Sequence, residues 1–107
     1  MSNKILNNKK LNETLPSTKV RPLISNRTGK PVVNQYSITV GNLVIFQSYN
    51  TRIAVKDMDT RQLTLDTNAL DYSVTTSRYL YQFTGLNRTE IMKGINKGTI
   101  KVEELNW

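Results

Sequence analysis

The chain has 107 residues, a formal net charge of +7, and neither cysteine nor histidine. This length fits one small domain, and without cysteine a disulfide-stabilised secreted scaffold or a thiolate metal site is not expected. The absence of histidine removes the commonest zinc ligand and general base, and no stretch approaches the roughly 20 apolar residues of a membrane span, so we expect no membrane partner.

The charge is distributed unevenly along the chain. Residues 1–33 hold seven of the fifteen Lys and Arg against one acid, a net +6, whereas residues 34–107 hold eight bases against seven acids. All three prolines lie in the first part and all eight aromatic residues lie in the second. We therefore predict an extended or disordered basic arm over 1–33, followed by a compact domain over 34–107.

The compact domain opens with a predicted β-hairpin. Apolar and polar residues alternate over 36–40, Gly41 and Asn42 supply a two-residue turn, and Leu43–Ser48 follows as the second strand. Pairing Val40 with Leu43 places Val44 and Phe46 on a half-covered face. The other face is the predicted core side, with Tyr36, Ile38, Val40, Leu43 and Ile45.

Two further strands are predicted at Thr51–Lys56 and Leu63–Asp66, on either side of a polar loop. Their inward candidates are Ile53, Val55, Leu63 and Leu65. With the hairpin they form a four-stranded antiparallel meander.

An amphipathic helix is predicted within Leu70–Leu86, because Tyr79, Leu80 and Phe83 fall on one of its faces. Ser73 or Thr75 can cap its N-terminus, and Gly85 stands where a left-handed C-terminal residue is wanted.

A second helix is predicted to begin after Asn87, with Glu90 completing a capping box, and to end at Gly98. Thr99–Leu105 then reads as a short final strand. The predicted fold class is α+β, a small antiparallel sheet of about four to five strands packed against two C-terminal helices and preceded by the extended basic N-terminal arm.

Three segments resemble a family of small uncharacterised proteins encoded by bacteriophages and mobile elements. They are FQSYNTRIA (Phe46–Ala54), LDYSVTTSRYLYQF (Leu70–Phe83) and KGINKGTIKVEEL (Lys93–Leu105). The resemblance covers about Asn34–Leu105. It implies a phage setting for a domain of unknown function and carries over no catalytic residue.

The sequence favours a protein that is not an enzyme and has no cofactor or metal. The aspartates at 57, 59, 66 and 71 do not fit a calcium-binding loop, because Gln62 and Asn68 replace the required Gly and Glu. Turn and cap chemistry explains these aspartates better. Activation of a Ser or Thr nucleophile would need a general base, and the sequence has none at a suitable spacing from a Ser or Thr. The sequence also has no Gly-rich phosphate-binding loop.

The basic arm is the main candidate binding element, since six net positive charges attract a polyanion largely independently of its sequence. Its candidate contacts with nucleic acid or another partner are Lys4, Lys9, Lys10, Lys19, Arg21, Arg27 and Lys30. A solubilising tail is the alternative interpretation.

A second candidate contact surface combines the hydroxyl-rich segments 48–52 and 72–78, if they lie together. Its candidate residues are Tyr49, Arg52, Tyr72, Ser73 and Arg78. Helix caps and a solvated strand end explain the same residues without a ligand.

We therefore expect a non-enzymatic, phage-type binding protein whose arm docks it to a large acidic partner, most plausibly nucleic acid or a nucleoprotein. One alternative is a structural or accessory subunit of a phage particle, in which Ile5, Leu6, Leu23 and Ile24 clamp neighbouring phage structural proteins. Another is an inhibitor of a host defence complex. The expected location is the host cytoplasm during infection or the phage particle, without secretion through a signal peptide.

Overall fold

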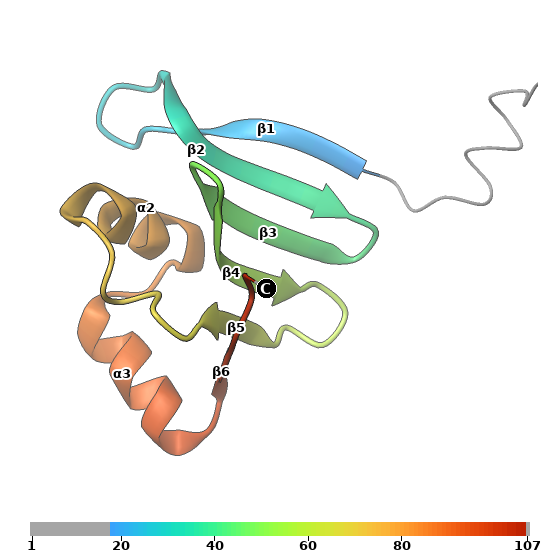
Figure 1. Ribbon diagram of the computed structural model, residues 1–107, viewed down its shortest axis with the longest axis vertical. Helices are drawn as coiled ribbons and strands as arrows, with labels where there is room; N and C mark the ends of the chain where they lie inside the picture. Colours follow the sequence, from blue (N-terminus) through green and yellow to red (C-terminus); the bar gives the residue numbers. More distant parts are fainter. Residues whose placement is uncertain (1–17, 107) are drawn as a thin grey trace, which may run out of the picture.

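The structure, a computed structural model, describes residues 18–106. Over this range the chain forms a six-stranded sheet with two helices on one of its faces, so the predicted α+β class is confirmed (Figure 1). The elements in chain order are β1 (Thr18–Ile24), β2 (Pro31–Val40), β3 (Leu43–Ser48), β4 (Thr51–Asp57), β5 (Leu63–Asp66), α2 (Val74–Thr84), α3 (Arg88–Lys97) and β6 (Ile100–Glu103).

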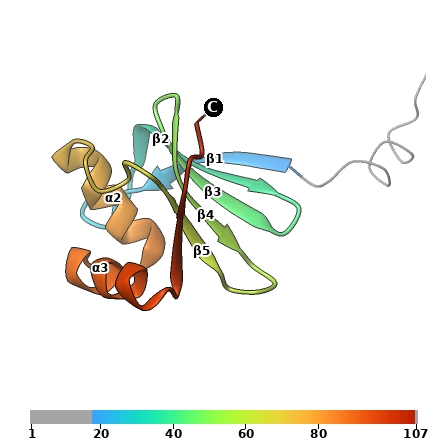
Figure 2. The same cartoon turned by 60° about the horizontal axis from the view of Figure 1, so that its bottom comes forward.

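The strands lie in the sheet in their chain order. The first four pairings are antiparallel, and β6 pairs with β5 in parallel. A parallel neighbour requires a crossover, which the two helices supply between β5 and β6. Figure 2 shows that both helices lie on the same side of the sheet.

The β2–β3 hairpin has the predicted register. Val40 pairs with Leu43 and Ile38 with Ile45, around the turn at Gly41 and Asn42. Gly41 has a φ of 59°, the left-handed conformation that a tight hairpin turn requires.

The predicted core face of this hairpin is wrong. Phe46 is fully buried, whereas Ile38 and Ile45 are half-buried on the opposite face. Val55, which was expected to point inward, lies on that opposite face as the partner of Ile45. Both faces of the hairpin carry apolar residues, and the face that becomes the core is the one that the helices cover.

Folded structure begins with β1, ahead of Asn34, where the compact domain was predicted to start. Strand β1 pairs with β2 along most of its length, and β2 itself begins at Pro31. Pro22 removes one ladder donor, which an edge strand such as β1 tolerates. The connecting turn is closed by the Ser25 hydroxyl, which accepts hydrogen bonds from the backbone N–H groups of Arg27 and Thr28.

Both helices have the predicted caps. The Ser73 side chain accepts a hydrogen bond from the N–H of Thr76, and Gly85 ends α2 at a φ of 72°. The capping box of Asn87 and Glu90 begins α3, and Gly98 ends it.

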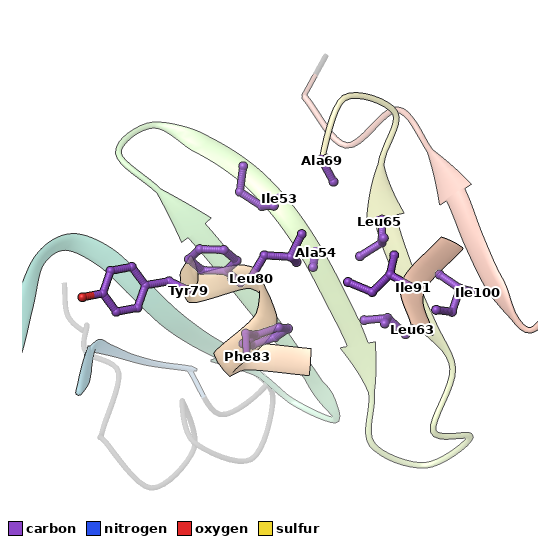
Figure 3. Close-up of a cluster of buried hydrophobic side chains, with 11 residues drawn as sticks. Ile53, Ala54, Leu63, Leu65, Ala69, Tyr79, Leu80, Phe83, Ile91 and Ile100 are labelled. Carbon is purple, nitrogen blue, oxygen red and sulfur yellow. The ribbon is translucent and has the colours of Figure 1, made fainter. Parts of the chain in front are cut away.

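The core lies between the helices and the sheet (Figure 3). As predicted, Tyr79, Leu80 and Phe83 of α2 are buried. The Phe83 ring stacks on Phe46 at 5.6 Å between centroids. In Figure 3, Ile91 of α3 points towards Leu65, in a cluster completed by Leu63 and Ile100.

Candidate functional site

A groove of about 800 Å³ runs along the outer face of α2. The β1–β2 loop borders it on one side, and the start of α3 borders it on another. Three arginines from three separate segments line it, namely Arg27 of the loop, Arg78 of α2 and Arg88 of α3. The arginines are accompanied by Tyr72 and Tyr81 together with the exposed apolar side chain of Val74, among other lining residues.

The helical period of α2 places three of the lining residues on one face of the helix. Val74, Arg78 and Tyr81 lie three or four residues apart and therefore share one face of α2. This face is turned away from the core because Tyr79, Leu80 and Phe83 occupy the inner one.

The β1–β2 loop is fastened to the same helix by Gln82. Its side-chain amide donates to the carbonyl of Ile24 at 2.6 Å and accepts from the N–H of Asn26 at 3.3 Å. These two bonds place the neighbouring Arg27 beside α2. At the other border, Arg88 donates to the carbonyl of Leu70 at 3.2 Å, which ties α3 to the segment before α2.

All charged residues that line the groove are basic. No Asp or Glu is among its lining residues. In the part of the chain that the structure describes, none of the three arginines forms an ion pair with a carboxylate. The residues that line the groove therefore carry a formal charge of +3.

A smaller hollow of about 220 Å³ lies at the N-terminal end of α2. It brings together Tyr49, Tyr72 and Ser73, so the two hydroxyl-rich segments do lie side by side. The Ser73 hydroxyl is engaged as the helix cap, and the hydroxyls of Ser48 and Thr76 bond to each other at 3.1 Å. The hydroxyls of Ser48, Ser73 and Thr76 therefore already form hydrogen bonds within the protein.

Tyr72 lines both the groove and the smaller hollow. Its hydroxyl donates to Asp66 at 3.0 Å. Burial and this bond to a carboxylate raise the pKa of Tyr72, so the phenol stays neutral.

Asp66 anchors the C-terminal end of the chain. Burial raises its pKa, but hydrogen bonds from the N–H groups of Leu105 and Asn68, the Tyr72 hydroxyl and the Asn106 amide outweigh that effect and leave the pKa below its ordinary value. The bond from Asn68 is the turn contact that the sequence predicted, and the bonds from Leu105 and Asn106 add a structural role that it did not predict.

The predicted arm residues divide into two groups. Lys4, Lys9 and Lys10 lie outside the described residues. Among the others, Lys19 and Arg21 are exposed on β1, Arg27 lines the groove, and Lys30 is exposed in the β1–β2 loop.

The second predicted surface is only partly assembled. Tyr72 and Arg78 meet in the groove, and Tyr49 and Ser73 meet Tyr72 in the smaller hollow. Arg52 stands apart from both, because its guanidinium donates to the carbonyl of Leu105 at 3.0 Å.

Sequence reasoning missed Arg88 and Tyr81 as lining residues. Tyr81 follows Arg78 by three positions in the predicted helix, which is a usable signal. Arg88 had none, because its place beside α2 depends on how α3 turns back.

No helix in residues 18–106 is long and apolar enough to cross a membrane. Over the same residues, no cluster of three or more acidic side chains is placed to hold a metal ion.

Comparison with known proteins places the folded part of the chain in a family. The sequence model of a family of unknown function (DUF8033) matches residues 18–101, from the first residue of β1 into β6. No curated protein and no solved structure matches the chain.

Proposed function

The chain belongs to this family of unknown function, and we propose that it is a non-enzymatic nucleic-acid-binding protein of phage type. The observation that carries the proposal is the groove along α2, where Arg27, Arg78 and Arg88 converge without a carboxylate among the lining residues. Such a site favours an anionic ligand, and three separated guanidinium groups suit a ligand with several anionic groups.

The chemistry of the lining favours phosphate groups on a chain of bases. A guanidinium offers parallel N–H donors that match phosphate oxygens, and each such bond is charge-assisted. The rings of Tyr72 and Tyr81 and the apolar side chain of Val74 lie among these charges. Basic groups interleaved with aromatic rings are the arrangement with which proteins hold single strands, because unpaired bases can stack on the rings.

The remaining basic residues extend this surface. Lys19 and Arg21 are exposed on β1, which leads into the loop that borders the groove, and Lys30 lies in that loop. We propose them as further phosphate contacts, together with Lys4, Lys9 and Lys10.

The lining residues also favour binding over catalysis. The groove contains the hydroxyls of Ser25 and Ser77 but no carboxylate or histidine to act as their base. Arginine side chains supply hydrogen-bond donors and positive charge but no acceptor, so they do not replace the missing base.

The resemblance of the motifs to phage-encoded proteins supports a role during infection or in the particle. The alternative of a particle subunit clamped by short apolar runs has less support, because fewer of its apolar residues are free to contact a partner. Leu23 packs against the core of its own domain, whereas Ile24 remains exposed. Nucleic-acid binding through the groove is accordingly the proposal we favour.

The test is equilibrium binding of a fluorescent single-stranded oligonucleotide to the full chain and to two charge-matched variants. The groove variant replaces Arg27, Arg78 and Arg88 by Gln. The control variant replaces Arg61, Lys93 and Lys97 by Gln, three exposed bases that do not line the groove.

Both variants have the same net charge, so only the position of the lost charges differs. Loss of three charge-assisted contacts should weaken binding by the groove variant at least about tenfold beyond the control. Equal affinity of the two variants would show that the groove is not the binding site.

A further inference from the structure

The face of the sheet opposite the helices carries an apolar surface over strands β1–β4. Register aligns Val20, Ile38, Ile45 and Val55 in one row across four neighbouring strands. On either side of this row, the same face presents Tyr36, Val40, Leu43 and Pro22. No helix of the described chain covers this face (Figure 2). Val20 is 61% exposed, and the other residues of the row are half-buried.

We propose that a second copy of this chain covers this surface, so that two sheets pack face to face as the halves of a β-sandwich. We call the surface formed by Val20, Tyr36, Ile38, Val40, Leu43, Ile45 and Val55 the open face. An aligned apolar row on a monomer marks an interaction surface. Two sheets with apolar inner faces pack at about 10 Å in sandwiches of this kind.

The charges at the border of the open face suit a second copy. The chain as a whole carries +7, which would repel another copy at most surfaces. On this face, however, Asp57, Lys101 and Glu103 border one shallow hollow together with Leu43 and Val55, so both signs are present.

Lys101 and Glu103 lie two residues apart on β6 and face the same way. Both signs therefore lie at one edge of the face, and a second copy can offer each of these side chains an opposite charge, as a self-complementary interface requires. The open face is thus electrostatically able to pair with itself.

The size of the face is also sufficient. With strands about 4.8 Å apart and side-chain rows about 6.8 Å apart, three rows on β1–β4 and two on β5 and β6 cover about 520 Å² per copy, or about 1,040 Å² for two. A specific interface needs about 1,000 Å² in total. The estimated area is therefore large enough for a specific interface.

Nucleic acid fits this face poorly. Lys101 is the one base that lines its hollow, and two carboxylates stand beside it. The helices lie on the other side of the sheet (Figure 2). Face-to-face pairing would therefore leave both arginine-lined grooves on the outside of the dimer. The dimer is therefore independent of the proposed nucleic-acid site.

The test is the mass of the full chain, without nucleic acid, by sedimentation equilibrium from about 1 to 200 μM, the range over which a moderate interface dissociates. Two variants place a lysine in the apolar row, Val20→Lys and Ile38→Lys. Val20 lies on an edge strand and is largely exposed, so this variant should fold even if Ile38→Lys does not. The control is Met92→Lys, at an exposed apolar residue on α3.

The expected result is a concentration-dependent dimer that both row variants weaken at least tenfold and the control leaves unchanged. A full chain that stays monomeric throughout would overturn the proposal. A dimer that Met92→Lys disrupts as strongly as Val20→Lys would place the interface elsewhere and would also overturn it.

Discussion

Replacing Gly94 by Ala should destabilise the protein although alanine is the better helix former. Gly94 lies in the interior of α3 and is buried where β6 crosses beside the helix. A Cβ at this position would stand 2.5 Å from Cδ1 and 2.7 Å from Cγ1 of Ile100. The substitution therefore combines a helix-propensity gain with a steric clash.

The clash should win. The propensity gain is about 1 kcal/mol, whereas overpacking a core site costs about 1–3 kcal/mol. The Cδ1 methyl of Ile100 can swing away, but Cγ1 cannot move without a change of χ1, which is stiff in a β-branched residue. Ile100 is itself buried, so little space receives it. The net loss should be up to about 2 kcal/mol, which lowers the melting temperature by up to about 10 °C.

Urea unfolding followed by circular dichroism measures this change, with Asn96→Ala as the control at an exposed position of the same helix. The control should be neutral or slightly stabilising. In an Ile100→Ala background the two contacts under 3 Å are gone and only Thr99 Oγ1 remains close, at 3.3 Å. Gly94→Ala should then stabilise by up to about 1 kcal/mol. Stabilisation by Gly94→Ala in the unchanged chain would refute the reasoning.

Three further predictions concern buried side chains. Phe83→Ala should lower the free energy of unfolding in urea by about 3–5 kcal/mol. The ring is buried against Phe46, and Lys56 Nζ lies 4.5 Å from its centroid. A loss under about 1 kcal/mol would contradict this packing. Gln35 has a buried Oε1 without a hydrogen-bond partner in the described structure, so Gln35→Met should leave the free energy of unfolding unchanged or raise it by about 1 kcal/mol, and a clear loss would reveal a bound partner. Since the folded pKa of Asp66 is lowered, its contribution is present above its unfolded pKa of about 4 and is lost as the pH falls through the folded value. Asp66→Asn should therefore destabilise at pH 7 and less so at pH 2, and a constant difference would argue against this structural role of the charged carboxylate.

The sequence predicted the features that depend on neighbouring residues. The register of the β2–β3 hairpin follows from its turn at Gly41, and the caps at Ser73 and Asn87 follow from their own first helical turns. Phe83 was predicted to point inward from the helical period alone, and it does. Each of these rests on contacts within a few residues of sequence.

Features that depend on distant segments were not predictable in this way. Phe46 and Ile45 alternate on one strand and are both apolar, so local periodicity does not say which face the helices will cover. Strand β1 contains proline and two basic residues, and it becomes a strand because β2 offers it a partner.

The groove is the same kind of case. Arg27, Arg78 and Arg88 come from a loop and two helices, and the bonds of Gln82 to the loop and of Arg88 to Leu70 assemble its borders. Charge counting located the basic N-terminal part of the chain but could not place one of its arginines beside two from the C-terminal helices.

The salt dependence of oligonucleotide binding tests the central claim most directly. For single strands, the slope of log K against log salt changes by about 0.7 for each phosphate contact. The full chain should therefore show a slope steeper by about 2 than the variant with Gln at positions 27, 78 and 88, since three contacts are lost. The charge-matched variant at 61, 93 and 97 should keep the slope of the unchanged chain. Equal slopes for the full chain and the groove variant would contradict nucleic-acid binding through the groove.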